Sequence, residues 1–189
     1  MELHSVTGDI VEEAPSRCDM TALWLGVGFN RRSQTWQAIR ARYPEMRLVP
    51  PPPEMPWRNP EGVTFEISPP DGLLRYIHVL PNRADAHGCP DLPAVGAAVG
   101  SALDVAKGLR VRKVGFIHIP VSPGGWKPTP TECEWSASAM IGALGAWEAS
   151  HPKRITDVFL VDLGGDFDRF VELATRNPPP AGPNIEPPE

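Results

Sequence analysis

Short apolar runs alternate with segments of helical periodicity along most of this chain, and this order restricts the fold more than any single motif does. Strands that alternate with helices form a parallel or mixed sheet with helices on both faces. We therefore expect an α/β fold, a three-layer α/β/α sandwich with a mixed, mostly parallel sheet. The predicted strands cover residues 22–28, 63–67, 73–80, 113–120 and 157–163, and the predicted helices cover residues 33–43, 92–107, 131–150 and 166–175.

Local signals mark where several of these elements begin and end. Pro44 stops the helix that begins at residue 33, and Asp71-Gly72 is typical of a hairpin turn between two strands. Thr131 and Glu134 have the spacing of a capping box, which predicts that Thr131 caps the helix that follows.

Composition excludes several classes of function. The chain has 189 residues, a net charge of −5 and no stripe of clustered Lys and Arg, so it shows no strong signal of nucleic-acid binding. Its three cysteines, Cys18, Cys89 and Cys133, are scattered and lack the C-x-x-C spacing of zinc sites. The five histidines show no metal-binding spacing either. We expect no metal and no cofactor.

Domain organisation follows from the distribution of proline. The chain has 24 prolines, and a cluster near its end carries almost no apolar side chains. Residues 1–176 are predicted to form one domain and residues 177–189 a disordered Pro-rich tail, which is either a plain tail or a ligand for a partner domain. No secretory signal and no run of about 18 apolar residues is visible, so we expect a cytoplasmic protein with no membrane contact.

A glycine-rich loop follows the predicted strand 113–120 and precedes the helix 131–150. It contains Ser122, Gly124, Gly125 and Trp126. Backbone N–H groups of such a turn, with the positive end of the next helix, can cradle a phosphate, but ordinary strand-to-helix turns use the same residues. Glycines also lie at the ends of two further predicted strands, Gly28 at the end of one and Gly164-Gly165 in the loop after the other, which favours one ligand site at the carboxyl ends of the strands.

Several stretches together resemble the macro domain, the ADP-ribose-binding fold. They are Gly8-Asp9-Ile10, Tyr76-Ile77-His78-Val79, Ser122-Pro123-Gly124-Gly125 and Val158-Phe159-Leu160-Val161-Asp162. The resemblance covers roughly residues 3–175. It implies a domain that binds ADP-ribose or a related nucleotide diphosphate derived from NAD.

The resemblance also implies roles for individual residues. Asp9 and Ile10 would contact the adenine, although an Asp after Gly is also a common turn or cap residue. The loop residues Ser122, Gly124, Gly125 and Trp126 would face the diphosphate, with Trp126 either stacking on the ligand or anchoring the loop. The remaining contacts are assigned to Gly28, Phe29 and Asn30 at the distal ribose, and to Gly165 and Asp166 at the distal ribose or adenine, with Phe167 nearby as a candidate stacking ring.

Residues 26–33 resemble most the ADP-ribosyl-DNA glycohydrolase branch, whose helix ends in Phe-Pro-Glu where this chain has Tyr43-Pro44-Glu45. Ser33 occupies the position of the lysine of that branch, and Asn30 is the candidate to orient a water. Three functions stay open: a binding domain, an ADP-ribosyl hydrolase acting on modified protein or nucleic acid, and a non-catalytic structural domain. His78 and His118 are predicted to be packed core residues rather than ligands or bases.

Overall fold

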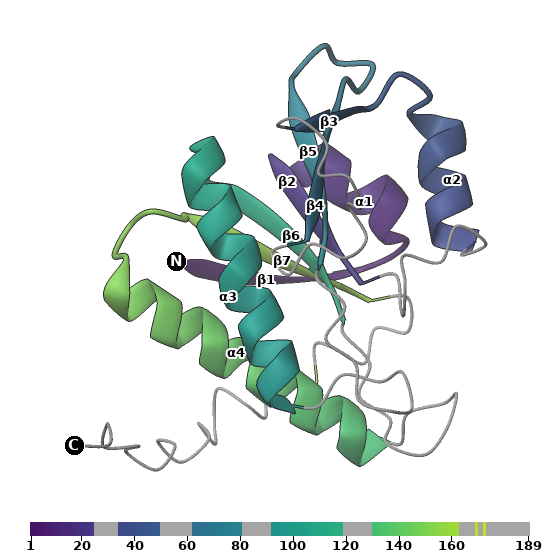
Figure 1. The fold of residues 1–189 in the computed structure, drawn as a ribbon. Helices are drawn as coiled ribbons and strands as arrows, with labels where there is room; N and C mark the ends of the chain where they lie inside the picture. Colours follow the sequence, from purple (N-terminus) through teal and green to yellow (C-terminus); the bar gives the residue numbers. More distant parts are fainter. Residues whose placement is uncertain are drawn as a thin grey trace.

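The structure is a computed structural model that describes residues 1–24, 34–49, 62–80, 92–118 and 130–162, together with Arg169 and Glu172. These residues form a seven-stranded sheet with helices on both faces (Figure 1). The strands are β1 (Glu2–Thr7), β2 (Met20–Leu23), β3 (Arg47–Val49), β4 (Val63–Ile67), β5 (Arg75–Val79), β6 (Lys113–Ile117) and β7 (Asp157–Asp162). The helices are α1 (Ile10–Arg17), α2 (Gln34–Arg42), α3 (Leu92–Leu109) and α4 (Pro130–Ser150).

The sheet is mixed and mostly parallel, as predicted. Its strand order is β1-β7-β6-β2-β5-β4-β3. The pairs β1–β7, β7–β6, β6–β2 and β2–β5 are parallel, whereas β4 runs antiparallel to both β5 and β3. The carboxyl ends of five neighbouring strands therefore lie along one edge of the sheet, which we name the carboxyl edge, and their amino ends lie along the opposite amino edge.

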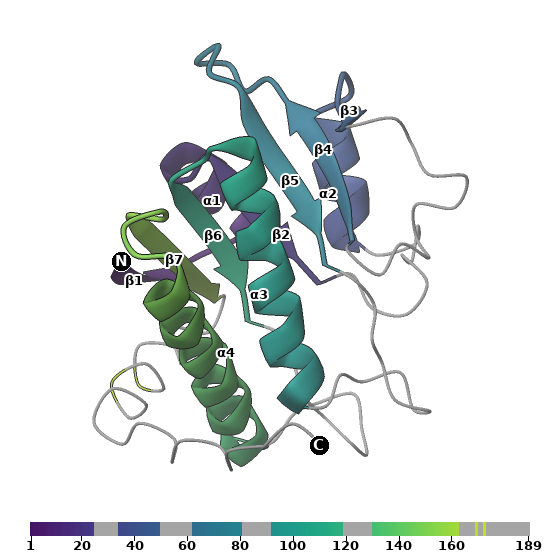
Figure 2. The same ribbon diagram turned by 60° about the vertical axis from the view of Figure 1, so that its left-hand side comes forward.

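Two separate cores confirm the three-layer sandwich. On one face, α3 and α4 lie alongside each other over the middle of the sheet, and α1 and α2 cover the other face (Figure 2). Successive side chains of a strand point to opposite faces. In β2, Met20 and Ala22 accordingly pack under α3 and α4, while Leu23 joins the second core beneath α1 and α2.

α3 is apolar enough to need an explanation. Among the described helices, it alone has the length and hydropathy that crossing a membrane would require. Its buried residues, among them Val95, Val99 and Leu103, share one face that packs in the core with α4 and the sheet. The apolar composition of α3 is accounted for by its place as a core helix.

Most predicted elements are confirmed, with shifted ends. The strand 63–67 matches β4 in full, and the predicted helices 33–43, 92–107 and 131–150 match α2, α3 and α4 within two residues. β2 begins at Met20, two residues before its predicted start. β5 begins at Arg75 rather than at residue 73, and Leu73 and Leu74 are more than half exposed.

The predicted cap of α4 was wrong. The helix begins at Pro130, which places Thr131 inside its first turn. Proline is favoured in this first turn because its missing N–H has no helical partner there in any case. Of the predicted helix 166–175, the structure describes only Arg169 and Glu172, both helical. The tail 177–189 lies outside the described residues.

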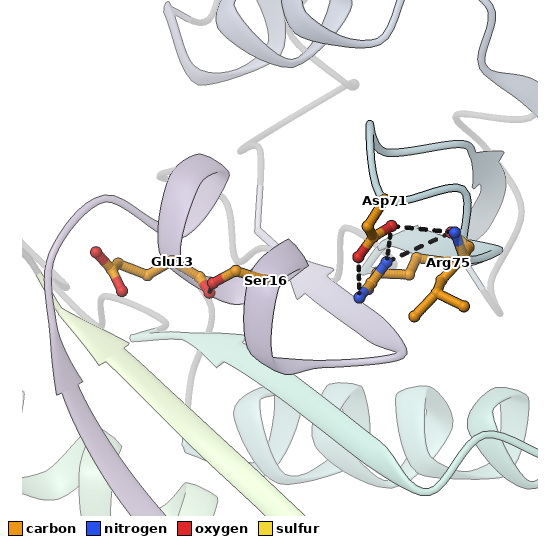
Figure 3. A network of polar contacts seen from close by, with 5 residues as sticks. Glu13, Ser16, Asp71 and Arg75 are labelled. Atoms are coloured by element: carbon orange, nitrogen blue, oxygen red, sulfur yellow. Dashed lines mark hydrogen bonds and ion pairs between the residues drawn. The ribbon is translucent and has the colours of Figure 1, made fainter.

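The hairpin between β4 and β5 forms at Asp71-Gly72, as predicted. Gly72 has a φ of +74°, in the left-handed region that favours glycine, and its N–H donates to the carbonyl of Pro69. Both carboxylate oxygens of Asp71 contact guanidinium nitrogens of Arg75 (Figure 3), and each of the two distances is 2.8 Å. The Arg75 hydrogen bond and the backbone N–H of Leu73 hold the pKa of the Asp71 carboxyl below its usual value.

Candidate functional site

The carboxyl edge brings the ends of five parallel strands together, and it is the part of the fold where α/β proteins bind ligands. Thr7, Leu23, Val79, Ile117 and Asp162 are the last residues of these strands. α3 and α4 follow β5 and β6 in the chain, so both helices begin on the side toward which these strands point (Figure 1). A helix N-terminus carries partial positive charge and free N–H groups, which favour an anion.

The turn from β1 into α1 is described in full, and Asp9 is at its centre. Asp9 is the N-cap of α1: its Oδ1 accepts a hydrogen bond of 2.8 Å from the N–H of Val11. Its side chain is exposed, and no described residue donates to its second oxygen, Oδ2. One oxygen of Asp9 thus stabilises the helix while the other is accessible to a ligand.

Gly8 and Ile10 fix the position of this carboxylate. Gly8 has a φ of +152°, and a Cβ on it would lie 2.6 Å from Cγ of Glu13, so a larger residue would be strained and crowded here. Its N–H donates to the carbonyl of Asp162 at 3.0 Å, which joins the turn to the end of β7. The side chain of Ile10 is buried in the core beneath α1, so only the backbone of this predicted site residue could face a ligand.

A histidine and an aspartate occupy neighbouring positions where β6 and β7 end. Ile117 pairs with Val161 in the parallel register, so His118 and Asp162 follow at the next position of each strand. Burial lowers the pKa of the His118 imidazole, while the Asp162 carboxylate and a backbone hydrogen bond with Cys133 act to raise it. His118 is half-buried, and its contact with Cys133 links the end of β6 to the start of α4.

His78 is a packed core residue, as predicted. Its exposed fraction is 1 %, its Nδ1 lies 2.9 Å from Thr64 Oγ1, and burial lowers its pKa to about 4. Gly62 packs against its ring with a φ of +84°, and a Cβ on Gly62 would lie 2.9 Å from His78 Nε2 and still closer to the carbonyl of Val79. These contacts pack the side chains at the end of the β4–β5 pair.

The predicted site residues divide into two groups. Asp9 and Ile10 are described and lie just after the carboxyl end of β1, while their contact with adenine stays a prediction. The other predicted contacts lie outside the described residues, and their roles stay predictions; they are Gly28, Phe29, Asn30, Ser122, Gly124, Gly125, Trp126, Gly165, Asp166 and Phe167.

Sequence reasoning missed two features of this edge. It did not pair His118 with Asp162, because their proximity depends on β6 and β7 being neighbours, which no local pattern shows. It also weighed Asp9 as either a ligand contact or a cap, whereas the structure shows that it is a cap with one oxygen to spare. The spacing of Asp9 before Glu12 and Glu13, acidic residues in a first helical turn, is the signal that could have identified the helix.

Comparison with known proteins identifies solved structures of the same shape. No protein-family model matches the chain, and no curated protein matches its sequence. A Trypanosoma brucei macrodomain in complex with ADP-ribose is 12% identical, with a TM-score of 0.56 over 92% of this chain and 69% of that one. An Oceanobacillus iheyensis macrodomain is 15% identical, with a TM-score of 0.58 over 92% of this chain and 93% of that one. The macro domain of ganglioside induced differentiation associated protein 2 is 13% identical, with a TM-score of 0.55 over 92% of this chain and 82% of that one.

Proposed function

Since this chain has the macrodomain fold, we propose that it binds ADP-ribose, or a related nucleotide diphosphate derived from NAD, at the carboxyl edge of its sheet. The observation that carries the proposal is the exposed carboxylate of Asp9, which has one oxygen available at the edge where five parallel strands end. The T. brucei macrodomain, solved in complex with ADP-ribose, supports this choice of ligand.

The charges along the edge give the ligand an orientation. Asp9 lies in the turn that follows β1, and Asp162 ends β7, the strand that pairs with β1; the N–H of Gly8 in this turn donates to the backbone carbonyl of Asp162. Carboxylates repel phosphate and accept hydrogen bonds from amino and hydroxyl groups. The nucleoside therefore belongs at the β1–β7 end of the edge. The diphosphate belongs nearer the start of α4, where helix N–H groups favour an anion.

An Asp9→Asn variant separates the two roles of this residue. Asparagine caps a helix about as well as aspartate, so its amide oxygen can keep the bond to the Val11 N–H and the stability should change by less than about 1 kcal/mol. Its NH₂ group would then replace the oxygen that accepts from the adenine amino group. We expect titration calorimetry to show ADP-ribose binding weakened by about 1.5–3 kcal/mol, the contribution of a hydrogen bond to a charged group.

The inosine analogue of ADP-ribose supplies the matched control. It carries a carbonyl where adenine has its amino group, so the unmodified protein should reject it and the Asp9→Asn variant should accept it. An unchanged preference between the two nucleotides would exclude Asp9 from the base site. Absence of ADP-ribose binding to the unmodified protein would contradict the whole proposal and favour the structural role. Hydrolysis of an ADP-ribosyl bond stays a prediction tied to Asn30, outside the described residues.

A further inference from the structure

Three potential metal ligands lie together at the amino edge of the sheet, on the opposite side from the proposed nucleotide site. Glu2 and His4 are two residues apart on β1 and therefore point to the same face, and Glu2 pairs directly with Asp157 at the start of β7. The two carboxylates and the imidazole each offer one atom, and these atoms all lie within 4.8 Å of one another. The N label of Figure 1 marks this corner of the molecule.

The imidazole of His4 is held in a defined orientation. Its ring stacks on Phe159, the cross-strand neighbour of His4, with 4.7 Å between the ring centroids and 20° between the planes. This stacking directs Nε2 toward Oδ1 of Asp157, 3.0 Å away. A ring fixed in this way loses little conformational freedom on binding an ion, so part of the entropic cost of binding is met in advance.

The carboxylates place a local excess of negative charge here. Glu2 and Asp157 are directly opposed on neighbouring strands, where like charges repel. No described residue forms a hydrogen bond or ion pair with the Glu2 side chain. Lys113 pairs with Asp157 on its other side and offsets part of the charge, and the hydroxyl of Thr156 donates to Oδ2 of Asp157 at 2.7 Å.

We propose that Glu2, His4 and Asp157 form a binding site for a divalent transition-metal ion such as Zn²⁺, with water completing the coordination. One imidazole and two carboxylates suit ions of intermediate softness, whereas Mg²⁺ and Ca²⁺ take oxygen ligands. Around one Zn²⁺ with bonds of about 2.1 Å, ligand atoms lie roughly 3.4 Å apart. The exposed Glu2 side chain can close that gap by a change of rotamer.

The sequence analysis led us to expect no metal because the proposed ligands are far apart in the sequence. His4 and Asp157 are 153 residues apart, and only the pairing of β1 with β7 unites them. The site is independent of the proposed function, because none of its residues lies on the carboxyl edge. A failure of one proposal therefore says nothing about the other.

Zinc titration of the full chain tests the site, with titration calorimetry as the readout. We expect a saturable step of one equivalent that His4→Gln and Asp157→Asn each weaken by at least about 10–100-fold, the range already reached by losing an outer-shell partner. The matched control is His151→Gln. His151 also stacks on an aromatic ring, that of Trp147, but is not part of the cluster.

Thermal unfolding of the same proteins without zinc shows whether each variant is folded, and zinc should raise the melting temperature of the unmodified protein and of His151→Gln only. Loss of the zinc-dependent shift in folded His4→Gln, with the shift retained in His151→Gln, supports the site. The proposal is overturned if no saturable step occurs, if His4→Gln and Asp157→Asn keep it, or if His151→Gln loses it.

Discussion

Gly115 shows how a single missing side chain sets the distance between a helix and the sheet. It lies in the middle of β6, on the face that α1 covers. A Cβ at this position would lie 2.9 Å from Cys18 Sγ and 3.1 Å from Ala14 Cβ. Cys18 is buried beside it, and this burial raises the pKa of the thiol to about 12, so Cys18 acts as a packed apolar group rather than a reactive thiol.

A Gly115→Ala substitution should therefore destabilise the protein. The added methyl group has to displace α1, and overpacking of this kind costs about 1–3 kcal/mol. The same substitution at Gly100, in α3, meets no atom within 4 Å and should stabilise the protein by about 0.5–1 kcal/mol, because alanine is the better helix former. Urea unfolding measures both, and equal effects at the two positions would contradict this account of Gly115.

At the scale of elements, α3 and α4 form one layer through a shared buried face, and a hydrogen bond between Trp147 and Asp104 adds to it. Trp147 of α4 is buried against α3, and its Nε1 donates to Oδ1 of Asp104 at 3.0 Å. The apolar spacing of α4 predicted that Ala137, Met140, Ile141, Leu144 and Trp147 share one buried face; four of them are buried, and Ile141 is half-buried. The hydrogen bond to Asp104 had no sequence signal, because it joins two helices that only the fold brings together.

This contact can be isolated by a double-mutant cycle. Trp147→Phe and Asp104→Ala each remove the hydrogen bond, which contributes about 0.5–1.5 kcal/mol. The double variant should lose less than the sum of the two, with the difference equal to the hydrogen-bond energy. Strict additivity of the free energies of unfolding would show that this hydrogen bond does not contribute to the stability of the helix pair.

Sequence reasoning missed β1, α1 and β3, and the first two of these share a physical cause. β1 carries Glu2 and His4 on one face and α1 has Pro15 inside it, so neither shows the apolar periodicity by which strands and helices are predicted. Both elements form because of their neighbours: β1 pairs with β7, and α1 buries Ile10, Val11 and Ala14 against the sheet. The central strands and the long helices could be predicted because their own side chains determine them.

At the scale of the whole molecule, stability depends on pH through His78 and His118, two histidines of the described part of the chain whose burial disfavours the charged form. Burial lowers the pKa of His78 to about 4 and also lowers the pKa of His118. In the unfolded chain a histidine takes up its proton near pH 6.5. Between these values the unfolded state binds more protons than the folded state, so the free energy of unfolding falls as the pH falls. Above about pH 6.5 this contribution to stability is fully present.

For His78 the free energy of unfolding should fall by about 3 kcal/mol between pH 6.5 and pH 4, at about 1.4 kcal/mol per pH unit in the middle of this range. Urea unfolding at a series of pH values measures it. His78→Gln can keep a hydrogen bond to Thr64 but has no titrating group, so its stability should change less between pH 6.5 and pH 4.5. Parallel pH profiles for the two proteins would show that His78 does not contribute.

The pairing of β1 with β7 also governs when the sheet can be completed during synthesis. Glu2 has no strand partner until Asp157, 155 positions later in the chain, has been synthesised. At a translation rate of about 5–20 residues per second, this delay is roughly 8–30 s. During this delay the backbone donors and acceptors of the β1 segment are unpaired, and unpaired strand edges can pair with other chains. Of the described strands, the first to leave the ribosome is among the last to be incorporated into the sheet.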